Sequence, residues 1–101
     1  MPADASLNLS GDLTMAEVPA VRKAHLDKLR AGNLPGQVDL SELDRTDSSA
    51  LALLLEWQSH AHRHGRRIEF IHPPQSLEML ARLSQTDALL GWNDSNGPDQ
   101  K

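Results

Sequence analysis

The sequence predicts a small α/β fold, with a parallel sheet of three to four strands packed against three to four helices. The chain has 101 residues, of which 39% are hydrophobic, and this suits a single domain with one modest core. Short apolar segments with a period of two alternate with longer segments of helical period. Strands separated by helices of this length pair in parallel through right-handed crossovers.

The first part of the chain contains one predicted strand and one predicted helix. Apolar and polar residues alternate over residues 6–10, which predicts a short strand ended by the glycine that follows. Thr14 and Glu17 have the spacing of a capping box, which favours a helix start there. Pro19 lies deeper than the first helical position, so either one backbone hydrogen bond is lost or the helix begins nearer the preceding residue. Gly32 is expected to end this helix.

The middle of the chain predicts a strand, an acidic turn and a long helix. Residues 37–41 indicate a brief central strand in which Asp39 interrupts two apolar residues. An acidic turn is expected over residues 42–47. The long helix is predicted from about residue 48 to residue 64, and Gly65 ends it.

The last part of the chain predicts one more strand and one more helix. Residues 66–72 alternate in polarity and indicate a strand, which a pair of prolines terminates. Residues 76–84 indicate a helix whose inward side chains are Leu77, Leu80, Ala81 and Leu83. We expect a single domain over residues 1–92 and a disordered tail over residues 93–101.

Composition excludes several classes of protein. A net charge of −4 and only 3% aromatic residues argue against nucleic-acid binding, which favours a basic surface and stacking rings. The absence of cysteine excludes disulfides and thiol chemistry. The longest apolar run, residues 50–55, is far shorter than the ~20 residues of a membrane-spanning helix. The N-terminus lacks the pattern of a secretory signal, so we expect a cytoplasmic protein without a membrane span.

Ser48 and Ser49, at the start of the long helix, are candidate partner-binding residues. A serine at this position often accepts a hydrogen bond from an unpaired backbone N–H, and capping alone explains one of the two. Asp47 immediately precedes them and is able to cap the helix by itself, which would leave a hydroxyl for another purpose. The partial positive charge of a helix N-terminus favours a phosphate or the acceptor groups of a partner.

The long helix carries an unusually wide apolar arc. Its apolar residues cover roughly 200° at 3.6 residues per turn, whereas packing on one side of a sheet requires about 100°. We therefore expect one flank, either Leu51 with Leu55 or Leu53 with Trp57, to be exposed or half-exposed near Ser48. Two explanations of the wide arc are equally good: contact with neighbouring helices, and a partner-binding edge.

Two further groups of residues were weighed as sites. His60 and His64 are one helical turn apart and are able to face one metal ion, but basic residues here also complement the negative end of the helix, and no third ligand is identifiable. We expect no metal and no cofactor. The histidines lie too far along the helix to activate Ser48, so catalysis is not expected. A basic patch, Arg63 with Arg66 and Arg67, is usually a solvated face, and contact with an acidic partner or membrane headgroups is the alternative.

The motifs on either side of the acidic turn resemble those of a known family. Asp39-Leu40-Ser41, followed by Asp47-Ser48-Ser49-Ala50-Leu51, is similar to the signature of STAS domains, which are named for sulfate transporters and anti-sigma factor antagonists. The similarity extends over residues 6–92. The LALLLEW run and the short chain are most similar to the MlaB-like members. This chain has Ala50 where the family usually has glycine, and it shows one strand where the family opens with a hairpin, so we expect a narrow sheet.

The resemblance implies a function and an alternative to it. MlaB-like members are non-catalytic cytoplasmic subunits of a phospholipid-transporting ABC complex, where they bind an MlaF-like ATPase subunit in a complex with a membrane permease at the inner membrane. The implied partner-binding residues are Asp47, Ser48, Ser49, Leu51 and Leu55. The alternative is an anti-sigma factor antagonist that a kinase partner phosphorylates at Ser48.

Overall fold

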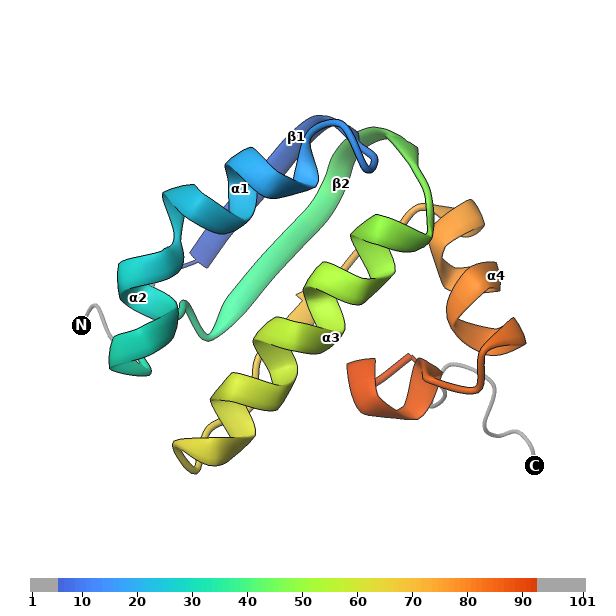
Figure 1. Ribbon diagram of the computed structural model, residues 1–101. Helices are drawn as coiled ribbons and strands as arrows, with labels where there is room; N and C mark the ends of the chain where they lie inside the picture. The colour runs from blue at the N-terminus through green and yellow to red at the C-terminus, as the bar shows by residue number, and fades with distance from the viewer. Residues whose placement is uncertain (1–5, 93–101) are drawn as a thin grey trace.

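The computed structural model describes residues 6–92, so the predicted tail over residues 93–101 lies outside the described residues (Figure 1). The elements follow one another as β1 (Ser6–Leu13), α1 (Val18–Ala24), α2 (Leu26–Ala31), β2 (Gln37–Thr46), α3 (Ser48–Arg63), β3 (Glu69–Ile71), α4 (Gln75–Leu83) and the short 3₁₀ helix η2 (Asp87–Leu90). The predicted α/β class and the predicted numbers of strands and helices are confirmed.

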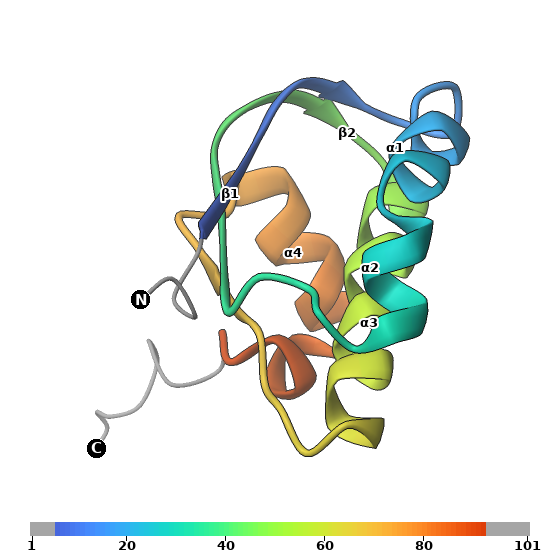
Figure 2. The ribbon, with the colours of Figure 1, turned by 90° about the vertical axis from the view of Figure 1, so that its left-hand side faces the viewer.

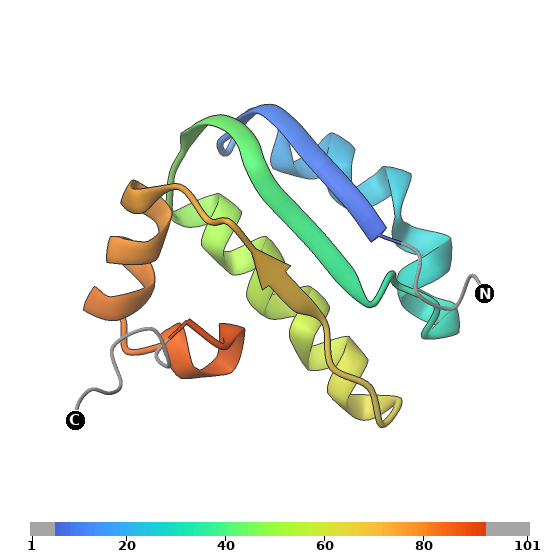
Figure 3. The same cartoon turned by 180° about the vertical axis from the view of Figure 1, so that it is seen from behind.

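The three strands form one parallel sheet in the order β1-β2-β3, which confirms the parallel pairing and the central position of β2. Figure 2 shows α1, α2 and α3 together on one side of the sheet. Seen from behind in Figure 3, the strands lie in front of these helices, while α4 and η2 lie beyond the β3 edge. No helix within residues 6–92 covers the other face of the sheet. The helices therefore form a single layer against one sheet face.

The core lies between β2 and α3. Val38 and Leu40 on β2 and Leu53, Leu54 and Trp57 on α3 are fully buried in one cluster. The expectation of an exposed or half-exposed flank is wrong for Leu51, which is 6% exposed, and for the pair Leu53 and Trp57, which is fully buried. Leu55 alone is half-buried, as predicted. Most of the wide apolar arc is buried within the molecule, because α3 packs against α1 and α2 and also against α4 and η2.

The segment predicted as an acidic turn is the second half of β2, which is therefore twice as long as predicted. From Asn8 to Ser10, β1 advances two residues while β2 advances three, and the same happens again between Gly11 and Leu13. Each extra residue in β2 makes a bulge, which breaks the alternation of side chains that identifies a strand in a sequence.

An aspartate side chain satisfies a backbone N–H group at each bulge. At the first bulge, Asp39 accepts a hydrogen bond from the backbone N–H of Ser41 at 2.9 Å. At the second, Asp12 on β1 accepts one from the backbone N–H of Arg45 at 3.3 Å. Two aspartates outside the predicted turn thus help to keep an irregular strand paired.

The predicted first helix is divided into α1 and α2. Its start at Val18, with Pro19 in the first turn, confirms the second of the two predicted starts. The break falls at His25, whose Nδ1 lies 3.0 Å from the carbonyl oxygen of Val21. The backbone N–H of His25 would bond this oxygen in an unbroken helix, but it bonds Arg22 instead. The imidazole then rests against Trp57, with 5.3 Å between the ring centroids.

The structure corrects the predicted third strand, because β3 contains only Glu69–Ile71. The buried side chain of Gln58 accepts a hydrogen bond from the N–H of Ile68 at 2.8 Å and donates to the carbonyl of the same residue at 2.9 Å. Arg66 donates from its guanidinium to the carbonyls of Gly32 and Leu34, at 2.6 and 2.5 Å. The backbone groups of Ile68 and the guanidinium of Arg66 are therefore bonded outside the sheet, and the strand begins only at Glu69.

The predicted inward face of the last helix is corrected at one position. Leu77 and Ala81 on α4 are fully buried and Leu80 packs against the core, as predicted. Leu83 is 79% exposed. Leu83 follows Ala81 by two residues, which is about 200° around the helix, so its side chain lies on the face opposite the buried one.

Candidate functional site

Asp47 is the residue that organises the N-terminal end of α3. Its backbone is extended, with φ −142° and ψ −168°, and its Oδ1 accepts a hydrogen bond from the backbone N–H of Ser49 at 2.8 Å. Its Oδ2 accepts a second bond from the backbone N–H of Met15 at 3.1 Å. The carboxylate therefore caps α3 and also joins it to the turn that follows β1. Of the two predicted arrangements, capping by Asp47 is the one found.

Because Asp47 caps the helix, the hydroxyl of Ser48 is not used for capping. Ser48 is the first residue of α3 and its side chain is exposed, while Ser49 is half-buried. Within residues 6–92 the Ser48 hydroxyl has no hydrogen-bond partner. It lies in the first turn, where the unpaired N–H groups of the helix create a partial positive charge. This hydroxyl is available to an acceptor or to a phosphoryl group.

The surroundings of this helix end are acidic. The hydroxyl and the backbone N–H of Thr14 both bond the carboxylate of Glu17, at 2.6 and 2.8 Å. The bond from the Thr14 hydroxyl is the main reason why the pKa of Glu17 lies below its ordinary value, while the nearby charge of Asp47 acts in the opposite direction. The carboxyl groups of Asp47 and Glu17 thus lie close together at this end of α3 and favour a partner surface with positive charge.

Met15 is a residue of this site that the sequence did not single out. It is 71% exposed, and it is one of the few large apolar side chains that residues 6–92 leave open to solvent. A shallow hollow of about 200 Å³ lies beside it, bordered by Met15, Val18, Pro19, Arg22, Ser49 and Ala52. Only the long-range bond from Asp47 brings Met15 to α3, so no local pattern was able to reveal it.

The two predicted leucines of the site lie in different environments. Leu51 is buried beneath the first turns of α3, whereas Leu55 is half-buried. Ser48, Ala52, Leu55 and Ser59 recur at the spacing of one helix face and form an exposed stripe along α3. On one flank of this stripe Glu56 forms an ion pair with Arg22 of α1 at 2.9 Å. We call this face, Ser48 to Ser59, the α3 stripe.

Comparison with known proteins agrees with this geometry. A protein-family model described as "Mlab, STAS domain" matches residues 2–91. The chain belongs to the STAS domain family. No curated protein matches the chain. Among solved structures, the anti-sigma factor antagonist SpoIIAA in its unphosphorylated form superposes with a TM-score of 0.63 over 77% of this chain and 72% of that chain, at 18% sequence identity. This likeness shows that the fold is the STAS fold.

The STAS domain described here tolerates Ala50 where the family usually has glycine. Ala50 is fully buried and lies within the regular helix α3. A helical residue does not need the backbone angles that only glycine adopts readily. The substitution therefore extends the apolar face of α3 without strain.

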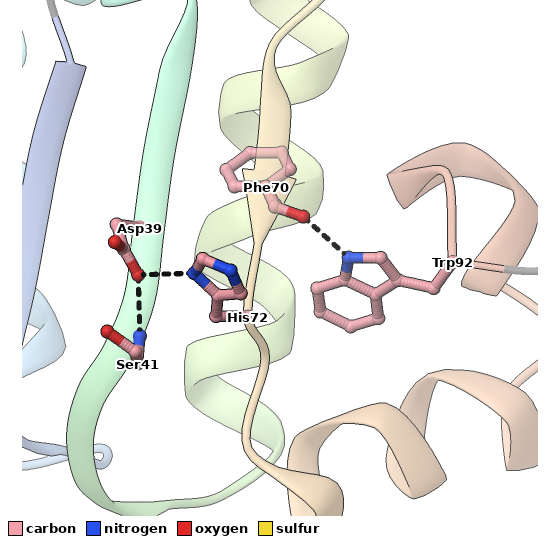
Figure 4. A network of polar contacts seen from close by, with 5 residues as sticks. All are labelled: Asp39, Ser41, Phe70, His72 and Trp92. Carbon is pink, nitrogen blue, oxygen red and sulfur yellow. Dashed lines mark hydrogen bonds and ion pairs between the residues drawn. The ribbon is translucent and has the colours of Figure 1, made fainter. Parts of the chain in front are cut away.

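A second polar network of this STAS domain joins the first half of β2 to the residue that follows β3 (Figure 4). The Oδ1 of Asp39 bonds the N–H of Ser41 and lies 3.3 Å from Nδ1 of His72. The Ser41 N–H is the main cause of the lowered pKa of Asp39. Nearby, Nε1 of Trp92 donates to the carbonyl of Phe70 at 2.9 Å, so the end of the described chain is held against β3. These contacts stabilise the β3 edge and lie apart from Ser48.

The histidines of α3 do not converge. Nδ1 of His64 lies 2.9 Å from the carbonyl oxygen of His60, and its ring packs against Gly32, where an added Cβ would approach to 2.5 Å. Within residues 6–92 no group of three potential ligands is placed to hold a metal ion. None of the helices in this part of the chain has the length and apolar character to cross a bilayer.

Proposed function

We propose that this STAS domain is a non-catalytic, cytoplasmic accessory subunit of an ABC-type phospholipid transporter. In this role it binds the ATPase subunit and supports its activity, in a complex with a membrane permease at the inner membrane. The observation that carries the proposal is the exposed and unpartnered Ser48 hydroxyl, which is available because Asp47 caps α3. The family description, which names MlaB, supports a transporter rather than a catalytic role.

The proposed contact combines polar and apolar groups. The Ser48 hydroxyl and the carboxylate of Asp47 offer an acceptor and donor pattern to the ATPase, and Met15 offers an exposed apolar side chain beside them. Ser49 and Leu55 extend the contact along the α3 stripe. Leu51 contributes from beneath, because it packs α3 against the core. An exposed apolar side chain with polar groups around it is typical of a protein interface.

Co-purification with the ATPase subunit tests this proposal. Ser48→Lys and Met15→Lys place a positive charge against the basic partner surface and are expected to lower recovery of the complex about tenfold or more. Ser10→Lys and Leu83→Lys are matched controls, since both positions are exposed and lie on other elements. Unchanged recovery with both contact variants would exclude the N-terminal end of α3 as the docking surface. Leu51→Asp is unsuitable as a test, because a charge at this buried position lowers the stability of the domain and would weaken binding indirectly.

The alternative function is an anti-sigma factor antagonist regulated by phosphorylation at Ser48. The same exposed hydroxyl favours it, since a kinase requires access to the side chain. A phosphate there would add roughly two negative charges beside Asp47 and Glu17 and would change the partner surface. Intact-mass measurement of the protein from its native host distinguishes the two functions. A single unmodified species under all growth conditions would contradict the switch, and a stoichiometric phosphorylated form would support it.

A further inference from the structure

The far end of α3 contains a second hollow that the proposed contact at Ser48 does not use. It is a groove of about 420 Å³ between α3 and η2. Its lining residues are Leu55, Gln58, Ser59, His62, Arg63 and Leu89. Two of them, Leu55 and Ser59, belong to the α3 stripe, so the groove continues the face on which Ser48 lies.

The groove is apolar along one side and cationic at one end. Leu89 on η2 is 52% exposed and Leu55 is half-buried, so both offer apolar surface to a ligand. Gln58 lines the groove but is occupied, since its side chain bonds Ile68 and donates to the carbonyl of Leu89 at 3.1 Å. Arg63, in the last turn of α3, forms no ion pair within residues 6–92. A free guanidinium beside apolar surface favours a carboxylate carried on an apolar segment.

The distribution of charge sets the direction of such a segment. Ser48 and Arg63 are separated by ~22 Å along α3 at 1.5 Å per residue. The Ser48 end carries the carboxylates of Asp47 and Glu17, while the Arg63 end carries Arg63 and the exposed His62. A partner lying along the stripe is complementary if it is basic near Ser48 and acidic near Arg63.

We infer that the groove between α3 and η2 binds an acidic, amphipathic segment of the ATPase subunit. In this arrangement an apolar side chain of the segment lies between Leu55 and Leu89, and a carboxylate pairs with Arg63. The inference rests on the proposed function and adds a second contact, separate from the one at Ser48. The sequence pattern left the basic patch open between a solvated face and contact with an acidic partner or membrane headgroups, and the adjoining groove favours an acidic partner.

Affinity measurements with the purified domain and the purified ATPase subunit test the inference. Arg63→Gln and Leu89→Ser are each expected to weaken binding about tenfold, and the Arg63 effect decreases at high salt. Arg30→Gln and Leu83→Ser are matched controls. Arg30 also lies in the last turn of a helix, and Leu83 is also an exposed leucine near the C-terminal end. Equal affinity for the wild type and both groove variants would overturn the inference.

Photo-crosslinking separates a failure of this inference from a failure of the proposed function. A photoreactive residue is placed at Leu89 in one sample and at Ser48 in another, each mixed with the ATPase subunit. Crosslinks from both positions, with the Leu89 crosslink in an acidic amphipathic peptide, support both statements. A crosslink from Ser48 alone overturns the groove and leaves the proposed function standing. A crosslink from Leu89 to a second copy of this chain reassigns the groove to self-association, and none from either position overturns both.

Discussion

The N-terminal end and the C-terminal half of α3 are each held by one polar side chain, but the two side chains differ in burial. At the N-terminal end, the half-buried Asp47 joins the helix to a turn far away in sequence through Met15. At the C-terminal half, the buried Gln58 satisfies backbone groups of the segments before β3 and within η2. In both places one polar side chain fixes two chain segments and leaves the neighbouring surface free. Removing the Gln58 side chain should destabilise the fold more than removing that of Asp47. Gln58 is only 2% exposed, so water does not readily replace its hydrogen bonds.

The largest effect on the free energy of unfolding is expected at Leu51, in the core beneath α3. Leu51→Asp places a carboxylate in a position that is 6% exposed, and it should lower the free energy of unfolding by about 4 kcal/mol or more. Urea denaturation followed by circular dichroism measures this loss. Leu83→Asp is the control, since its side chain is exposed. A Leu51→Asp protein with wild-type stability would show that this flank of α3 is open after all.

A smaller effect is expected from Gln58→Leu. The substitution keeps a similar volume but leaves the buried backbone groups of Ile68 and the partly buried carbonyl of Leu89 without their partner, which should cost about 2–4 kcal/mol. Ser59→Ala, at the exposed neighbour, serves as the control for urea denaturation. A loss as small as that of the control would mean that water reaches this part of the molecule and that the two ends of α3 are built alike.

Asp47→Ala should have a smaller effect again. It removes the cap of α3 and the bond to Met15, and the expected loss of stability is about 1–2 kcal/mol. Asp44→Ala, at an exposed acidic residue of β2, is the control. Hydrogen exchange of the Met15 and Ser49 amides reports on the mechanism, because both should lose protection in the Asp47 variant alone. Retained protection would show that the turn is held by other contacts.

The smallest effect is a pH dependence at the same helix end. The folded-state pKa of Glu17 lies below its ordinary value of 4.5, so its ionised form stabilises the fold above that pH. This contribution is lost as the pH falls through the folded pKa. The difference in unfolding free energy between the wild type and Glu17→Gln should therefore shrink as the pH is lowered from 6 to about 3. A difference that stays constant over this range would exclude a lowered pKa for Glu17.

Local sequence signals predicted an element wherever its hydrogen bonds and apolar spacing were regular. The helix over Ser48–Arg63 and the turn at Gly32 follow from periodicity and from glycine's left-handed backbone, which has φ +72° here. The second half of β2 was missed, because its two bulges shift the side-chain alternation. Residues 66–68 were assigned to β3 wrongly, since the bonds made by Gln58 and Arg66 come from side chains and not from a neighbouring strand.

For the candidate site, the sequence by itself determined the chemistry. The order Asp47, Ser48, Ser49 before an apolar helix predicted a cap from either a serine or Asp47, and the structure selects Asp47. The tertiary structure alone decided what surrounds them. In the folded chain Leu51 is buried and Leu55 is half-buried. Met15 bonds Asp47, and Leu89 lines the same groove as Arg63. Capping depends on neighbouring residues in the chain, whereas exposure depends on which helices pack against α3, and no local pattern contains that information.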